Sequence, residues 1–124
     1  YSKALKFFQK SLEMQQASLP SDDPSLLENY RNVASMYYQM NNYSKALEFF
    51  GKVLDIQRKS LPPTDPDLAV TYDYLGLVHQ HLKHESTAAT FFERAIDIAQ
   101  HTESGNQTNL EAYQKHLRTL RDEL

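Results

Sequence analysis

The chain has 124 residues, enough for one ordinary domain but short for two, and 40% of them are hydrophobic, so a packed core is expected rather than disorder. Its net charge of −3 lacks the basic excess that nucleic acids and anionic membranes attract, and we expect neither as a partner. The absence of cysteine excludes disulfides, thiolate metal sites and cysteine nucleophiles.

A repeat with a spacing of 42 residues runs through the chain: the letters YSKAL stand at residues 1–5 and return at 43–47. The same spacing relates three aromatic pairs, Phe7-Phe8, Phe49-Phe50 and Phe91-Phe92. A fixed spacing of about 20–50 residues is typical of a solenoid. We predict a single array with four parts: a partial repeat at 1–22, full repeats at 23–64 and 65–106, and a final helix at 107–124.

Residues 1–22 predict one helix, equivalent to the second helix of each full repeat. In the next copy this helix spans 44–59, where apolar residues recur at i, i+3 and i+4. It ends before Pro62-Pro63, because proline cannot continue a helix. The chain is therefore expected to begin with a second-type helix whose first-type partner is not in the sequence.

The first helix of each full repeat is predicted to begin at an Asp-Pro pair. Asp65 precedes a helical pattern over 66–82, and its carboxylate is suited to accept from the free amides of the first turn. Pro66 fits the first helical position. Asp23 and Pro24 carry the same signals one period earlier. Each full repeat is therefore predicted to contain two helices joined by a short turn.

The end of the chain predicts one more helix. The letters TNLE at 108–111 are typical of a capping box. We expect Leu117, Leu120 and Leu124 to face inward. Arg118 stands where the earlier repeats have a small residue, which is tolerable only where no further helix packs, so we interpret this helix as the polar cap of the array. The fold class is therefore predicted to be all-α, with about six antiparallel helices.

Small residues at the predicted helix crossings resemble those of the tetratricopeptide repeat (TPR) family, a helix A–turn–helix B unit. The family's Leu-Gly pair is matched by Leu75-Gly76, and its helix-B pattern by Ala88, Phe92 and Ala95. The preceding repeat has these residues at the same places: Val33-Ala34, Ala46, Phe50 and Val53. We expect Gly76 to face Ala88, because a larger side chain would overpack the crossing at a cost of roughly 1–3 kcal/mol.

The standard TPR unit has about 34 residues. The repeat of this chain is longer because the connection between its two full repeats is longer. The sequence of this connection, KSLPPTDPD at 59–67, resembles the repeats of kinesin light chains and their relatives. The resemblance covers essentially the whole chain. It implies a right-handed superhelix whose helices A line a concave surface, and a protein-binding scaffold rather than an enzyme.

We find no catalytic or cofactor motif in the sequence, and we predict no enzyme. Three glycines cannot supply a phosphate-binding loop, and no motif orders Ser, His and Asp into a triad. Histidines gather at His79, His81 and His84, but the first two diverge on a helix and the last two stand where the helix ends, so no metal site is predicted. We interpret His79 as a packing residue in place of a family tyrosine and His84 as a turn residue.

Two features bear on the cellular compartment. The letters RDEL at 121–124 resemble an endoplasmic-reticulum retrieval signal, and N-glycosylation sequons begin at Asn42 and Asn106. However, the helical pattern already accounts for Leu124, and Asn42 lies in a predicted tight turn. We favour a cytoplasmic location and keep the secretory pathway as the alternative.

The predicted helices A carry polar and aromatic side chains on one face, since residues three and four apart share a face. We expect this concave face to bind a peptide segment of a partner protein through Arg31, Asn32, Ser35, Tyr38, Gln39, Asp73, Tyr74, Leu77, His81, Lys115, His116 and Thr119. Asn32 stands where the family often places an asparagine that bonds the ligand backbone, whereas Tyr74 and His116 depart from that pattern.

Two other interpretations concern the array as a whole. It is alternatively a structural spacer or assembly segment of a longer array, with no ligand of its own. The missing partner of the first helix is also expected to leave part of a stripe formed by Ala4, Phe8 and Ser11 uncovered, and an exposed apolar stripe favours self-association.

Overall fold

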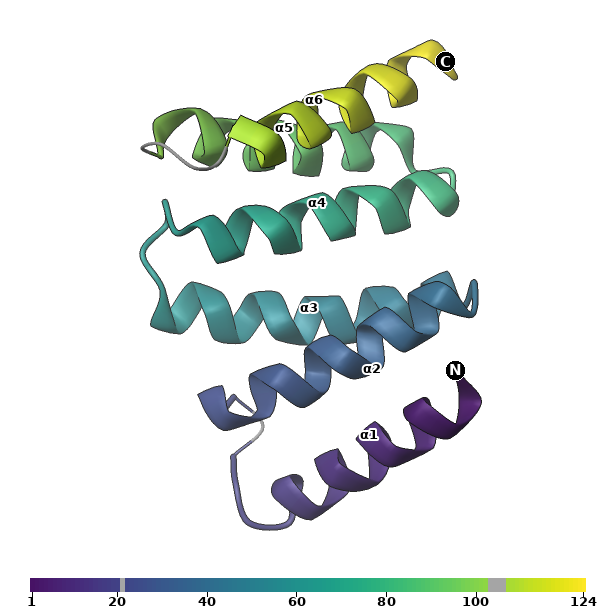
Figure 1. Cartoon of the computed structure of the whole chain (residues 1–124), viewed down its shortest axis with the longest axis vertical. Helices are drawn as coiled ribbons and strands as arrows, with labels where there is room; N and C mark the ends of the chain where they lie inside the picture. Colours follow the sequence, from purple (N-terminus) through teal and green to yellow (C-terminus); the bar gives the residue numbers. More distant parts are fainter. Residues whose placement is uncertain (21, 103–106) are drawn as a thin grey trace. The chain divides into compact units, whose positions relative to one another are not determined.

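The computed structural model describes residues 1–20, 22–102 and 107–124, without the side chains of 107 and 108. Within these residues the chain forms six α-helices, one short 3-10 helix and no strand (Figure 1). The helices are α1 (Ser2–Gln16), η1 (Pro24–Leu26), α2 (Leu27–Gln39), α3 (Tyr43–Ser60), α4 (Pro66–His81), α5 (Glu85–His101) and α6 (Gln107–Asp122). The predicted all-α class and helix number are confirmed.

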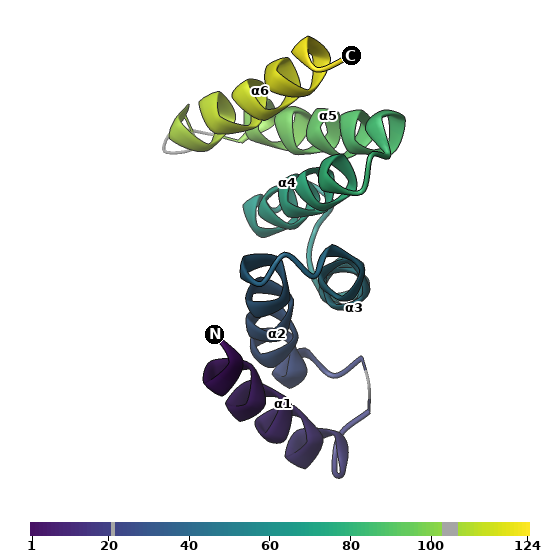
Figure 2. The same cartoon turned by 90° about the vertical axis from the view of Figure 1, so that its right-hand side faces the viewer.

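The chain divides into two compact units. The first unit, Tyr1–Ser60, contains α1, α2 and α3, and the second unit, Leu61–Leu124, contains α4, α5 and α6. In the first unit α2 packs against both α1 and α3, and in the second α5 packs against both α4 and α6 (Figures 1 and 2). Each unit has its own buried cluster of hydrophobic side chains.

The Asp-Pro pairs cap the helices as predicted. The Asp65 carboxylate accepts a hydrogen bond from the backbone N–H of Asp67 at 2.9 Å, at the start of α4. The Asp23 carboxylate accepts from the N–H of Ser25 at 2.8 Å, but the chain first forms η1 and α2 begins only at Leu27. For this reason α2 has 13 residues and is shorter than expected.

Helix α4 ends in a Schellman turn, a hydrogen-bonded reversal around one left-handed residue. Lys83 has a φ of 66°. Its N–H donates to the carbonyl of Gln80 at 3.1 Å, and the N–H of His84 donates to the carbonyl of His79 at 2.8 Å. In the equivalent turn after α2, Asn41 takes the left-handed position with a φ of 63°. The turn brings the side chain of the residue after the left-handed one back over the last turn of the helix.

The core of the first unit is built on α2. Tyr30 is fully buried, together with Leu12 of α1 and Ile56 of α3. Phe49 of α3 stacks on Tyr37 of α2, with 5.8 Å between the ring centroids. The apolar positions that recur with the sequence period are therefore the ones that join the helices.

The core of the second unit centres on Phe92 of α5, which is fully buried in a cluster with Ala88, Leu117 and Leu120. Gly76 of α4 lies directly against this ring: a β-carbon added to Gly76 would stand 2.6 Å from two ring carbons. The small residue expected at the crossing is therefore required there. The side chain nearest to Gly76 is that of Phe92, which belongs to the same buried cluster as the predicted neighbour Ala88.

The last helix differs from its prediction at its C-terminal end. Leu117 and Leu120 are buried and Arg118 is exposed as expected, but Leu124 is 76% exposed because α6 ends at Asp122. Helix α6 begins at Gln107, the first residue of the predicted range, and so already contains Thr108 of the predicted capping box. The side chain of Thr108 and the loop before it lie outside the described residues.

Helix α1 exposes apolar side chains beside the predicted stripe as well. Ala4, Phe8 and Ser11 are half-buried. The most exposed apolar side chains within α1 are Phe7 at 67% and Met14 at 70%. Any self-association through α1 would therefore use Phe7 and Met14 in the first place.

Candidate functional site

In the second unit, α4 and α6 line a pocket of about 430 Å³. Its wall is formed by Leu77, Gln80, His81, Lys83, Lys115, His116, Thr119 and Glu123. All the site residues predicted for this unit are among them except Asp73 and Tyr74. Lys83 was not predicted, and the only signal for it was its alignment with Asn41 at the left-handed turn position. Most of the site residues predicted for the second unit therefore line one pocket.

Asp73 and His116 join α4 to α6 beside this pocket. The His116 Nδ1 donates a hydrogen bond to the Asp73 carboxylate at 2.8 Å, between residues 43 positions apart. Asp73 is only 7% exposed, and a buried carboxylate needs such a partner. The contact holds the His116 ring against Phe92, with 5.8 Å between ring centroids. Asp73 is thus placed to position His116 rather than to reach a ligand itself.

The charged groups of the pocket are mainly cationic. Lys83 and Lys115 contribute two ammonium groups, whereas Glu123 is the only carboxylate among the described residues of the wall. The Glu123 carboxylate already accepts a hydrogen bond from Gln80 Nε2 at 3.0 Å. Leu77 adds an apolar surface that also packs against the core. A carboxylate on a short aliphatic chain matches this combination.

Two tyrosines near Asp73 differ in their exposure to solvent. Tyr74 of α4 is 38% exposed, so part of its side chain faces solvent. Tyr113 of α6 is buried, and burial raises the pKa of its phenol to about 12, with a further contribution from the charge of Asp73. Tyr113 is therefore neutral at physiological pH and belongs to the packing of α6.

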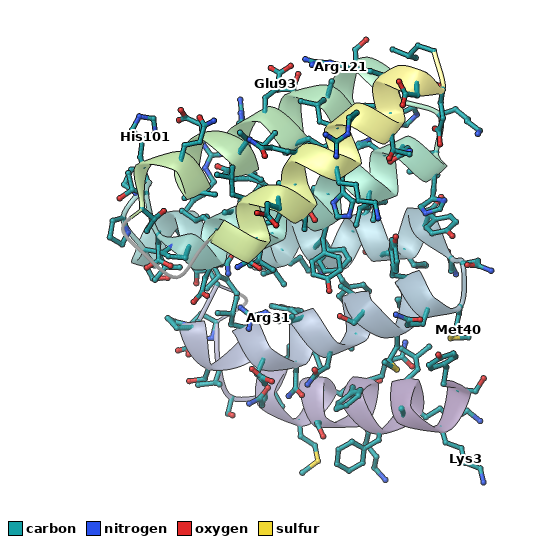
Figure 3. All side chains as sticks on the ribbon, turned by 45° about the horizontal axis from the view of Figure 1, so that its top comes forward. Lys3, Arg31, Met40, Glu93, His101 and Arg121 are labelled. Atoms are coloured by element: carbon teal, nitrogen blue, oxygen red, sulfur yellow. The ribbon has the colours of Figure 1, made fainter. Side chains whose placement is uncertain are left out.

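In the first unit, the predicted site residues all lie on α2, where Figure 3 labels Arg31. Gln39 is exposed and the others, Arg31, Asn32, Ser35 and Tyr38, are half-buried. The Tyr38 ring meets that of Tyr43 edge-to-face at 5.6 Å. A pocket of about 290 Å³ in this unit is lined by other residues. The predicted residues of α2 thus share the surface of one helix, and none of them lines this pocket.

The ion pair between Arg121 and Glu93 is formed by residues outside the pocket wall. Arg121 Nη2 of α6 is 3.7 Å from Glu93 Oε1 of α5, and both side chains are largely exposed (Figure 3). A pair of this kind contributes little to stability. Arg121 instead marks the polar outer side expected for this helix.

Neither a metal centre nor a membrane span emerges from the described part of the chain. Among those residues, no group of three or more His, Asp or Glu side chains lies close enough to hold a metal ion. None of the described helices combines the length and hydropathy that crossing a bilayer requires. His79 stacks on Phe91 with 5.5 Å between ring centroids and 8° between planes, in the packing role predicted for it.

A profile of the tetratricopeptide repeat family matches residues 1–59 and 25–101. A comparison with curated proteins finds no match. Among solved structures, BtubC (BKLC) from P. vanneervenii superposes with a TM-score of 0.89 at 18% identity, over 98% of this chain and 48% of that one. A Podosopora anserina protein described as a kinesin light chain with nearly identical TPR-like repeats superposes with a TM-score of 0.85 at 22% identity, over 96% of this chain and 56% of that one.

The chain therefore spans about half the length of these solved structures, and at such identities the likeness is one of fold. Proteins built from TPR units are generally protein–protein interaction scaffolds, and the repeat is a non-catalytic fold. The pairs α2–α3 and α4–α5 correspond to the helix A–turn–helix B unit. With the family profile covering most of its residues, the chain belongs to the tetratricopeptide repeat family, and its repeats are similar to those of kinesin light chains.

Proposed function

We propose that the chain binds a peptide segment of a partner protein on the surface of its helices A, of which α2 lies in the first unit and α4 in the second. The observation that carries this proposal is the pocket between α4 and α6. Its volume of about 430 Å³ lies within the range of roughly 300–1,000 Å³ that is typical of ligand sites. It is large enough for one or two peptide side chains.

In the second unit, charge and shape favour an acidic side chain in the pocket. Lys115 and Lys83 attract its carboxylate, and the Thr119 hydroxyl is a further hydrogen-bond donor. Leu77 contacts the aliphatic part of the ligand. Tyr74, exposed on the same helix, supplies an aromatic contact for the next part of the peptide.

In the first unit, α2 offers groups that suit a peptide backbone. Asn32 and Gln39 each carry an amide that both donates and accepts, as a peptide bond requires. Arg31 attracts a second carboxylate, and Tyr38 adds apolar surface. These contacts are made along one helix, so they favour an extended peptide over a compact ligand.

The test is a peptide array of acidic and neutral sequences, followed by titration of the hits. We expect affinities on the order of micromolar, about −8 kcal/mol, because the available surface is small. Tyr74→Ala should cost about 2 kcal/mol of binding free energy, and Asn32→Ala about 1. Lys115→Ala should weaken acidic peptides and reduce the dependence of binding on salt.

The matched controls lie outside the proposed surface. Lys45 and Glu48 of α3 form an exposed ion pair at 3.6 Å, so Lys45→Ala removes the same kind of charge as Lys115→Ala without touching the pocket. Each variant should keep the wild-type unfolding midpoint. Because Phe7 and Met14 are exposed, the titrations are repeated at several protein concentrations to separate self-association from peptide binding.

The alternative function is that of a structural spacer in a longer array. It is favoured by one observation: the chain covers only 48% and 56% of the solved structures that it resembles. If no peptide binds, or if the hits tolerate Tyr74→Ala and Lys115→Ala as well as Lys45→Ala, the peptide-binding proposal fails and the spacer function replaces it.

A further inference from the structure

We propose that His79 and His84 form a two-histidine site for a divalent transition-metal ion such as Cu²⁺, Ni²⁺ or Zn²⁺. Their Nδ1 atoms lie 3.1 Å apart, at the end of α4 in the second unit. The sequence does not predict this pair, because residues five positions apart do not share a face of a continuous helix. The site is separate from the peptide pocket, whose wall contains His81 but neither of these residues.

The backbone holds the two imidazoles in place before any ion binds. The His84 N–H donates to the His79 carbonyl at 2.8 Å, and the Lys83 N–H donates to the Gln80 carbonyl at 3.1 Å. The His79 ring is also stacked on Phe91, nearly parallel at 8°. Since both ligands are already ordered, an ion would not have to overcome their conformational entropy.

The separation of the nitrogens suits a chelate. Metal–nitrogen distances are about 2.0–2.1 Å for histidine ligands, so two nitrogens 3.1 Å apart subtend about 98° at the ion. This angle lies between the roughly 90° of square-planar Cu²⁺ or Ni²⁺ and the roughly 109° of tetrahedral Zn²⁺. No third His, Asp or Glu joins the pair within the described residues, so water completes the coordination and the expected affinity is on the order of micromolar.

Ligation requires a rearrangement of protons. Without metal, one Nδ1–H donates to the other Nδ1. A bound ion needs both Nδ1 lone pairs, so the proton between the rings must move to Nε2, or leave if the pair is charged. Burial lowers the pKa of His79, and the neighbouring His84 lowers it further, which favours the neutral ring that a metal needs.

The first repeat provides matched substitutions. Tyr37 and Asn42 occupy the places of His79 and His84 at the end of α2, and the N–H of Asn42 donates to the Tyr37 carbonyl at 2.8 Å. His79→Tyr and His84→Asn therefore each remove one ligand while introducing a residue that the same turn already accommodates. His81→Asn is the control, since it removes a nearby imidazole that lines the pocket instead.

The experiment uses the whole chain, made without an affinity tag and treated with a chelator. Calorimetric titration with CuCl₂, NiCl₂ and ZnCl₂ should give one ion per chain. His79→Tyr and His84→Asn should weaken binding about tenfold or more, whereas His81→Asn should leave it unchanged. Circular dichroism checks that each variant is folded.

A second measurement needs no variant. Substoichiometric Ni²⁺ should broaden the NMR signals of His79 and His84 before those of the other histidines. The proposal is overturned if no ion binds below millimolar concentration, if all five histidines broaden together, or if His79→Tyr and His84→Asn bind metal as the unmodified chain does.

Discussion

Replacing Gly76 by alanine should destabilise the protein, although alanine is the better helix former. The added β-carbon would lie 2.6 Å from two carbons of the Phe92 ring, about 0.9 Å closer than the roughly 3.5 Å at which two carbon atoms pack. The ring is fully buried and surrounded by Ala88, Leu117 and Leu120, so it has little freedom to move away. Overpacking of this kind costs about 1–3 kcal/mol.

Gly51 provides the matched control, because it also lies inside a helix and a β-carbon there would meet nothing within 4 Å. Replacing glycine by alanine in a helix interior gains up to about 1 kcal/mol from propensity alone. Gly51→Ala should therefore raise the free energy of unfolding by about 0.5–1 kcal/mol. Gly76→Ala receives the same gain but also the overpacking, so the two variants should differ by about 1–3 kcal/mol.

The assay is urea unfolding followed by circular dichroism. The unfolding midpoints of the two variants are compared where the slope of the free energy against urea concentration is the same for both. Gly76→Leu should be more damaging than Gly76→Ala, since the first unit accommodates a fully buried alanine at the equivalent Ala34. Phe92→Leu combined with Gly76→Ala should cost less than the sum of the single changes. If both alanine variants are stabilised equally, the close packing of Gly76 on Phe92 is refuted.

Three further predictions concern single groups. Burial lowers the pKa of His79 below its usual 6.5. The stability that its neutral ring provides is therefore complete above about pH 6.5 and is lost as the pH falls through the folded-state pKa. The drop in melting temperature on acidification should be smaller in His79→Tyr. Lys83→Gly should raise the free energy of unfolding by about 0.5–1 kcal/mol, because glycine adopts a φ of 66° without strain, and a lower urea midpoint would contradict this. The pKa of Tyr113 is raised from 10.0 to about 12, so its contribution is complete below pH 10.0 and is lost as the pH rises through about 12; an ultraviolet titration should lose its last-ionising phenol in Tyr113→Phe.

Much of the candidate site was predictable because helix periodicity places residues three and four apart on one face. Leu77 and His81 of α4 meet Lys115 and Thr119 of α6 in one pocket, as the repeat spacing indicated. Asp73 shares the face of Leu77 by the same rule, yet it is buried against His116. Periodicity gives the direction of a side chain from its own helix and carries no information on how close the next helix lies.

The sequence by itself determined where helices form and where α4 begins, because these depend on hydrogen bonds between residues a few positions apart. The carboxylate of Asp65 bonds an N–H two residues on, and this contact forms in almost any tertiary context. The repeat spacing likewise determined which positions are apolar and buried, since every copy must offer the same surface to its neighbours.

Only the tertiary structure decided which particular side chains touch. The ring that excludes a side chain at Gly76 belongs to Phe92, and Asp73 is bonded by a histidine 43 positions away. The contact between His79 and His84 is also decided by the folded structure. The two side chains meet because Lys83, which lies between them just after the end of α4, adopts a positive φ. Such contacts depend on distances between helices and on one backbone angle, and these are set by the packing of the whole unit rather than by the identity of neighbouring residues.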